Sequence, residues 1–185
     1  VELWFALNAL GVSVVPINPD LRLSELEYII SHSEMNAVFV LAERRDEVEL
    51  AARQAGRPIS VVTDQDEVPA PFGGARPSTV GGEASECALL YTSGTTGQPK
   101  GCVLTNTYFL HSGNWYRDVG GLIDLKNDGE RMITPLPLFH MNAMAVSLMA
   151  MLSVGGSLTM LDRFHPRTWW ASVRDSRATC LHYLG

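Results

Sequence analysis

Residues 91–101, YTSGTTGQPKG, combine residue types that suit the binding of an anion. The stretch holds three glycines, four Ser or Thr hydroxyls and one lysine. Glycines let backbone N–H groups converge on a phosphate, hydroxyls add donors, and a lysine adds the positive charge that a polyphosphate needs. We therefore expect a phosphate-binding loop built from Thr92, Ser93, Gly94, Thr95, Thr96, Gly97 and Lys100.

The spacing of these residues differs from that of the common nucleotide-binding loop. That loop reads G-x-x-x-x-G-K-[ST] and opens a helix whose N-terminus points at the phosphates. Here Pro99 directly precedes Lys100, and β-branched residues follow Gly101. The pattern predicts strand–loop–strand, with backbone N–H groups in place of a helix dipole, and makes a P-loop kinase a remote alternative. A plain Gly/Thr surface turn is the other interpretation of such a composition.

Strands and helices alternate on both sides of this loop. Before it, runs of β-branched residues predict strands at 12–18, 37–41 and 59–63, and a Ser24–Glu27 capping box is expected to open a helix. After it, we expect strands at 131–137, 157–161 and 179–184 and helices at 106–118, 139–154 and from about 165. Thr105 is the expected cap of the first helix, and Phe164 or His165 that of the last. The alternation predicts an α/β fold with mainly parallel sheets and right-handed crossovers.

Residues 64–86 interrupt the alternation with three prolines and four glycines. Such a composition is typical of a linker or a surface loop. We expect two layered α/β subdomains, at residues 1–63 and 87–185, joined by this linker. Because the chain begins inside a helical pattern and ends in a strand-like run, each subdomain is expected to be incomplete at its outer end.

Composition narrows the class of partner. The net charge of −6 disfavours nucleic acid and anionic membrane surfaces, which require basic patches. The most apolar stretch, Met141–Val154, is shorter than the roughly 20 residues that span a bilayer, and no signal peptide is visible. Cys87, Cys102 and Cys180 share no metal-ligand spacing and fit buried thiols of a reducing compartment, which indicates a cytoplasmic protein. The histidines show no metal-site spacing either: His32, His111, His165 and His182.

The loop YTSGTTGQPKG resembles the phosphate-loop signature of the adenylate-forming superfamily of acyl-CoA synthetases, luciferases and peptide-synthetase adenylation domains. Every fixed position from Ser93 to Gly101 is filled. ALGVSVVPINPDL (9–21), PLPLFHMNA (135–143) and the tail from GGSLTM onward resemble further family segments in the same order, so the resemblance covers essentially the whole chain. Thr95-Thr96 and Leu138-Phe139-His140 favour an acyl-CoA synthetase.

The resemblance implies a two-step reaction and a pocket. A carboxylate attacks the α-phosphate of ATP to give an acyl-adenylate and pyrophosphate, with Mg²⁺ assisting, and the thiol of coenzyme A then displaces AMP. The acyl pocket is implied at Phe139, His140, Met141, Asn142 and Ala143. His140 is implied to orient or gate the substrate carboxylate, and the alternative is a histidine at a helix N-terminus satisfied by backbone. Ala143 stands where the family has glycine, which leaves the size of the acid open.

The same resemblance places other catalytic parts after Gly185, including a Tyr-Gly-x-Thr-Glu segment, a ribose-binding Asp and a C-terminal lysine. We therefore expect a ligase as the parent protein and no turnover by this chain alone. Fatty or other hydrophobic acids are the expected substrates, with carnitine-like acids as an alternative. Two other functions stay open: an adenylating domain that loads a carrier protein, and a non-catalytic nucleotide-binding or interaction module. No oligomeric state is predicted.

Overall fold

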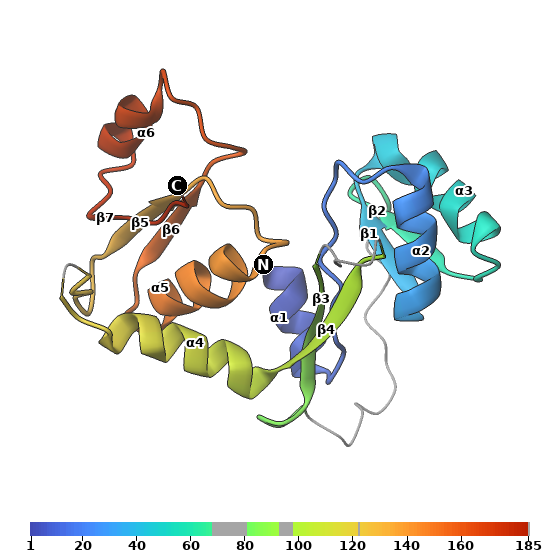
Figure 1. The fold of residues 1–185 in the computed structure, drawn as a ribbon, viewed down its shortest axis with the longest axis horizontal. Coiled ribbons are helices and arrows are strands. Elements are labelled where there is room, and N and C mark those ends of the chain that lie inside the picture. Colours follow the sequence, from blue (N-terminus) through green and yellow to red (C-terminus); the bar gives the residue numbers. More distant parts are fainter. Residues whose placement is uncertain (68–80, 93–97, 122, 185) are drawn as a thin grey trace. The chain divides into compact units, whose positions relative to one another are not determined.

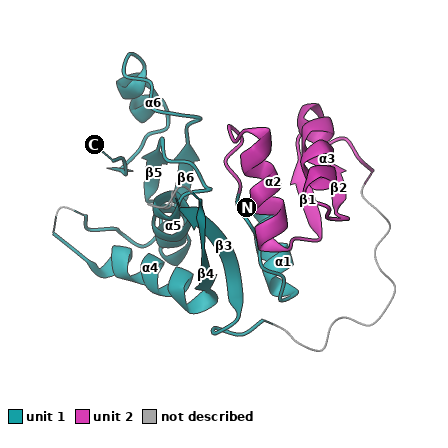
Figure 2. Ribbon diagram, turned by 45° about the vertical axis from the view of Figure 1, so that its right-hand side comes forward, with its two compact units in different colours: residues 1–16, 80–185 teal, residues 17–79 magenta. Residues whose placement is uncertain are grey.

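The computed structural model in Figure 1 describes residues 1–67, 81–92, 98–121 and 123–184. The chain forms two compact units, one of residues 17–79 and one of residues 1–16 and 80–185 (Figure 2). The expected division instead placed residues 1–63 in one subdomain. The difference arises because helix α1 (Glu2–Ala9) packs with the second half of the chain, where Trp4 shares a core cluster with Cys87 and Phe109.

The unit of residues 17–79 is a small βαβ layer. Strands β1 (Ala37–Val40) and β2 (Ser60–Thr63) pair in parallel, and the crossover between them contains the 3₁₀ turn η1 (Ala42–Arg44) and helix α3 (Arg45–Gln54). Helix α2 (Leu23–Ser33) precedes β1. The helices and the sheet share one apolar core, formed by Leu26, Ile30, Val48, Ala51 and Ala52. The strands predicted at 37–41 and 59–63 are confirmed.

Two local predictions in the first 33 residues are wrong. The cap of α2 uses Glu25, whose Oε2 accepts a hydrogen bond from the Arg22 N–H at 2.9 Å, rather than a Ser24–Glu27 pair. The stretch 12–18 forms no strand, only a parallel bridge between Val14 and Ala88. Pro16 lacks the N–H that a continuing ladder needs, so the pairing does not extend.

The other unit contains an antiparallel hairpin and a parallel sheet. Strands β3 (Glu86–Thr92) and β4 (Lys100–Thr105) form the hairpin. Helix α4 (Asn106–Asp118) follows at once, and Thr105 caps it as predicted by accepting the Tyr108 N–H at 3.3 Å. In the parallel sheet, β5 (Arg131–Thr134) lies between β6 (Ser157–Met160) and β7 (Cys180–Leu181).

The crossover helices of this sheet differ from the prediction in kind and length. The segment expected as an α-helix over 139–154 consists of a π-helix, η2 (Asn142–Leu148), followed by the α-helix α5 (Met149–Ser153). Helix α6 (Trp169–Asp175) begins after Thr168, not at Phe164 or His165. Strand β7 has two residues, where the sequence predicted six.

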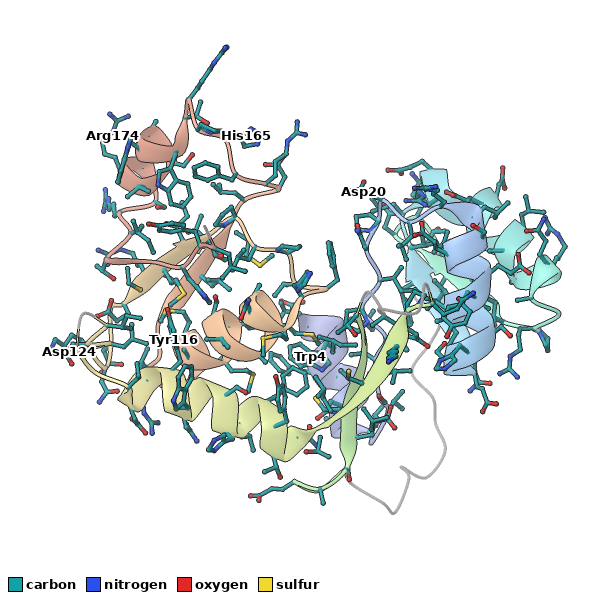
Figure 3. All side chains as sticks on the ribbon, in the orientation of Figure 1. Trp4, Asp20, Tyr116, Asp124, His165 and Arg174 are labelled. Atoms are coloured by element: carbon teal, nitrogen blue, oxygen red, sulfur yellow. The ribbon has the colours of Figure 1, made fainter. Side chains whose placement is uncertain are left out.

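The continuous helix η2–α5 is the centre of this unit. Its residues enter two apolar clusters, one with α1, β3 and α4 and one with α4 and β5. Figure 3 shows Tyr116 on α4, and its ring belongs to the second cluster. Helix α4 approaches α5 so closely that a Cβ added at Gly113 would lie 2.6 Å from the Met149 Cβ. In the described ranges of the chain, no helix is long and apolar enough to cross a membrane.

Candidate phosphate loop and acid-binding segment

The β3–β4 hairpin carries the candidate phosphate loop at its turn. Thr92 ends β3, Lys100 begins β4, and the two residues pair directly across the ladder, both exposed. The strand–loop–strand interpretation is therefore confirmed for the two flanks. Five candidate loop residues lie outside the described residues: Ser93, Gly94, Thr95, Thr96 and Gly97.

The packing of β4 explains why position 101 is a glycine, which the motif alone did not. It lies inside β4 opposite Tyr91, and an added Cβ would lie 3.0 Å from Leu89 Cδ1 and 3.4 Å from Tyr91 Cζ. Only a residue without a side chain leaves these neighbours undisturbed. The glycine thus allows Leu89 and Tyr91 to cover the strand next to Lys100.

The candidate acid-binding segment leaves the central strand β5 at its carboxyl end. Thr134 Oγ1 accepts the Leu136 N–H at 3.1 Å, and the His140 N–H donates to the Pro137 carbonyl at 3.0 Å. The His140 carbonyl in turn accepts the Met144 N–H at 3.0 Å. The imidazole of His140 is exposed, and its centroid lies 6.0 Å from that of the Phe139 ring. The backbone of His140 is therefore satisfied within the turn, and the ring is left accessible.

The residues of this segment do not share one face. His140 is exposed, Met141 is 38% exposed, Phe139 and Asn142 are half-buried, and Ala143 is 0% exposed. Ala143 therefore packs inside the unit, so an acid bound at the surface of the segment meets the side chains before it. A larger or smaller residue at 143 would therefore change the packing of η2 and not the exposed surface of the segment.

The strand before the candidate phosphate loop and the helix after the candidate acid-binding segment pack in one apolar cluster. Ala88 and Leu90 of β3 pack with Met144 and Ala145 of η2, and Leu138 packs against the same cluster. The strand that enters the phosphate loop and the helix that follows the acid-binding segment therefore share a core. Parallel α/β sheets bind ligands at the carboxyl ends of their strands, which is where residues 135–143 lie.

Comparison with known proteins agrees with this arrangement. A family model described as AMP-binding enzyme matches residues 1–184. The chain belongs to the AMP-binding enzyme family. It is 34% identical over 190 residues to a sulfoacetate–CoA ligase of Cupriavidus necator, with 99% of this chain and 36% of that protein covered. It is 31% identical to a feruloyl-CoA synthase of Amycolatopsis, with 96% of this chain and 34% of that protein covered.

Solved structures of the AMP-binding family have the same fold. A malonyl-CoA ligase in a ternary product complex with methylmalonyl-CoA and AMP matches with a TM-score of 0.74 and 27% identity, over 96% of this chain and 35% of that one. A fatty acyl CoA synthetase of Mycobacterium tuberculosis matches with a TM-score of 0.74 at 24% identity, over 97% of this chain and 35% of that one, which supports the fold alone. The chain thus spans about a third of the length of these relatives, and its resemblance to acyl-CoA synthetases is confirmed.

Magnesium, which the family resemblance implied, has no cluster of ligands in the described residues. These residues contain no group of three or more His, Cys, Asp or Glu side chains that could hold a metal ion. We therefore assign no residue of the described part of the chain to the ion and no step to the ion itself. The three thiols are free, as expected, but only Cys87 is buried, whereas Cys102 is exposed and Cys180 is half-buried.

One polar contact in this AMP-binding chain had no signal in the sequence. Nδ1 of His182, directly after β7, lies 2.5 Å from Oγ of Ser147, which is 0% exposed in η2. The Tyr116 ring stacks on the imidazole at 5.3 Å, and burial lowers the pKa of His182. The two residues are 35 positions apart, so no spacing rule connects them.

Proposed function

We propose that the protein containing this chain is an AMP-forming acid–CoA ligase. A carboxylate oxygen attacks the α-phosphorus of ATP, the bond to the β-phosphate breaks, and pyrophosphate leaves. The sulfur of coenzyme A then attacks the acyl carbon and AMP leaves. The observation that carries the proposal is the hairpin that places Lys100 beside Thr92 at the phosphate signature, in a chain that matches the AMP-binding family along its length.

Lys100 is proposed to act on the phosphates. Its side chain is exposed at the first position of β4, and a paired strand on one side fixes its backbone. A positive charge held in place before the reaction stabilises the negative charge that develops on the leaving pyrophosphate. Thr92 and the residues 93–97 are proposed to supply further donors to the same group.

The acid is proposed to bind along Phe139–Ala143 with an uncharged tail. Residues 135–143 contain no Lys, Arg, Asp or Glu, so the segment offers no partner for a second charge on the substrate. This composition supports a fatty or other hydrophobic acid. His140 is proposed to orient the carboxylate, since its imidazole is exposed and carries two ring nitrogens that can hydrogen-bond to a carboxylate.

The experiment is acid-dependent exchange of labelled pyrophosphate into ATP by the full-length protein that contains this chain. We expect exchange with octanoate or a cinnamate and little with an acid that carries a second charge. Lys100→Ala lowers the exchange rate by about 100-fold, as does the loss of one preorganised donor to a developing anion. Lys126→Ala is the matched control, because Lys126 is also an exposed lysine of this unit and its side chain pairs with the nearby Asp124.

The acceptor decides between the two possible second steps. A product that forms with free coenzyme A supports the ligase, and transfer only to a carrier protein bearing phosphopantetheine supports the alternative. If the full-length protein binds ATP but shows no pyrophosphate exchange with any acid, a non-catalytic module would be favoured. We also propose that the 185-residue chain shows no exchange by itself and that the protein works in the cytoplasm, which its three free thiols support.

A further inference from the structure

The π-helix η2 contains one fully buried hydroxyl, at Ser147. Its Oγ lies 3.3 Å from the carbonyl oxygen of Asn142, five residues earlier, and 2.5 Å from Nδ1 of His182. Asn142 is both the first residue of η2 and part of the proposed acid-binding segment. The hydroxyl therefore connects the start of η2 to a residue beyond β7.

The Ser147 hydroxyl has one proton, so it can donate to the Asn142 carbonyl or to Nδ1 of His182, but not to both. The Asn142 carbonyl can only accept, so the arrangement that gives each group a partner has the Ser147 O–H donating to Asn142. The Nδ1–H of His182 then donates to Ser147 Oγ. Because burial lowers the pKa of His182, its neutral form is favoured, and this tautomer leaves Nε2 as an acceptor.

His182 is itself held from two sides. Its backbone N–H donates to the Ile133 carbonyl of the central strand β5 at 3.1 Å. The Tyr116 ring on α4 stacks against the imidazole with an angle of 25° between the planes. The ring thus has a fixed place from which it can hold Ser147.

A π-helix bonds residues five apart instead of four and is rare, so we expect it to depend on such support. Relaxation of η2 to an α-helix would shift its upstream end by one residue, a rotation of about 100° about the helix axis. Met141 and His140, which precede η2, would then point in new directions. π-helical turns occur frequently at functional sites.

We propose that His182 is a positioning residue for acid binding, which acts through Ser147 to keep η2 in its π-helical form and so to aim the segment Phe139–Asn142. The inference rests on the proposed function and adds to it the residue pair that sets the fit of the acid. Because the ATP phosphates are proposed to bind at the β3–β4 hairpin, the pair is expected to act on the binding of the acid and not on that of ATP.

The test compares Ser147→Ala, His182→Phe and His182→Asn in the full-length protein. Phe keeps a ring against Tyr116 but has no Nδ1, whereas Asn keeps a side-chain N–H near that position. We expect the KM for the acid to rise about 10-fold in the first two variants, the effect of about 1.4 kcal/mol, with the KM for ATP within about 2-fold. His182→Asn is expected to keep most of the wild-type affinity for the acid. The double variant Ser147→Ala/His182→Phe is expected to have a KM for the acid no higher than that of either single variant.

Ser153→Ala is the matched control. Ser153 lies on α5, in the same continuous helix, and its Oγ donates to the Ala150 carbonyl at 2.8 Å in a contact of the same kind without the histidine. Backbone hydrogen exchange, followed by mass spectrometry, gives a readout that does not depend on activity. We expect faster exchange confined to peptides covering 139–148 in Ser147→Ala and His182→Phe, and no such change in Ser153→Ala.

The outcomes separate the two proposals. If the wild-type protein is inactive but the variants show faster hydrogen exchange at residues 139–148, His182 does support η2 and the proposed ligase function is wrong. If the wild-type protein is active and the variants change neither the KM for the acid nor the hydrogen exchange of residues 139–148, the role of His182 is overturned. Equal losses in the KM for acid and for ATP with a global rise in exchange would also overturn it, because they indicate a general loss of stability.

Discussion

At the scale of the residue, burial and not the sequence neighbourhood distinguishes the three thiols. Cys180 is half-buried beside β5, and burial followed by the nearby Glu130 carboxylate raises its pKa to about 11. Burial also raises the pKa of Cys87, which is 3% exposed. Cys102 is exposed on β4, although the composition predicted buried thiols throughout. The thiolate is the form of cysteine that attacks an alkylating reagent, so these environments predict different rates of alkylation.

We predict that iodoacetamide at pH 8 modifies Cys102 well before Cys180 in the folded chain. With a pKa of about 11, only about one Cys180 side chain in a thousand is a thiolate at this pH. Peptide mass spectrometry after timed quenching measures the three rates separately, and a sample unfolded in urea is the control in which the rates become similar. Equal rates for Cys102 and Cys180 in the folded chain would contradict the environment described for Cys180.

At the scale of the element, the contact between α4 and α5 limits what the helices can carry. Gly113 faces α5, and its hypothetical Cβ would lie 2.6 Å from Met149 Cβ and 2.8 Å from the Met149 carbonyl carbon. A side chain can rotate away, but backbone of a packed helix cannot move without displacing both apolar clusters. The glycine in the middle of α4 is therefore a packing requirement, not a helix-breaking signal.

We predict that Gly113→Ala lowers the free energy of unfolding by about 1–3 kcal/mol. In an exposed helix the same change would stabilise by up to about 1 kcal/mol, so the sign of the effect tests the close approach. Urea unfolding followed by circular dichroism measures it. Gly82→Ala is the control, since nothing lies within 4 Å of its added Cβ and its φ is not positive. A stabilising effect of alanine at 113 would show that α4 and α5 lie farther apart.

At the scale of the whole molecule, α1 belongs to the unit of residues 80–185 although it lies at the other end of the chain. Trp4 is 8% exposed, packs edge-on against Phe109 of α4 at 5.1 Å between ring centroids, and lies in the cluster of β3 and η2. Figure 2 shows residues 1–16 in the colour of that unit. Chain proximity would have assigned α1 to the core of residues 17–79.

A double-mutant cycle tests this assignment. We predict that Trp4→Ala costs about 3 kcal/mol of stability and couples to Phe109→Ala by about 1 kcal/mol, because each removes the other's partner. The same Trp4 change should add to Ile30→Ala within about 0.5 kcal/mol, since Ile30 lies in the core of the other unit. Denaturant unfolding of the single and double variants supplies the values. Coupling of Trp4 to Ile30 instead of Phe109 would assign α1 to the unit of residues 17–79.

Local residue patterns were enough for several parts of this protein. The β-branched runs predicted β1, β2 and the strand after the phosphate loop, and the Thr105 hydroxyl predicted the start of α4, which runs over the expected residues. The phosphate-loop signature was enough to predict the family. Each of these signals depends on neighbours within a few positions, and short-range backbone preferences act over that distance.

Packing decided the rest. The membership of α1 depends on Trp4 meeting Phe109, 105 positions away, and the π-helical form of η2 cannot be recognised from an apolar run that is equally suited to an α-helix. Ser147 and His182 carry no mutual signal, because a hydroxyl and an imidazole 35 residues apart become partners only when β7 pairs with β5. Side-chain chemistry was therefore readable in the chain, whereas the choice of partner required the folded core, where one set of neighbours excludes all others.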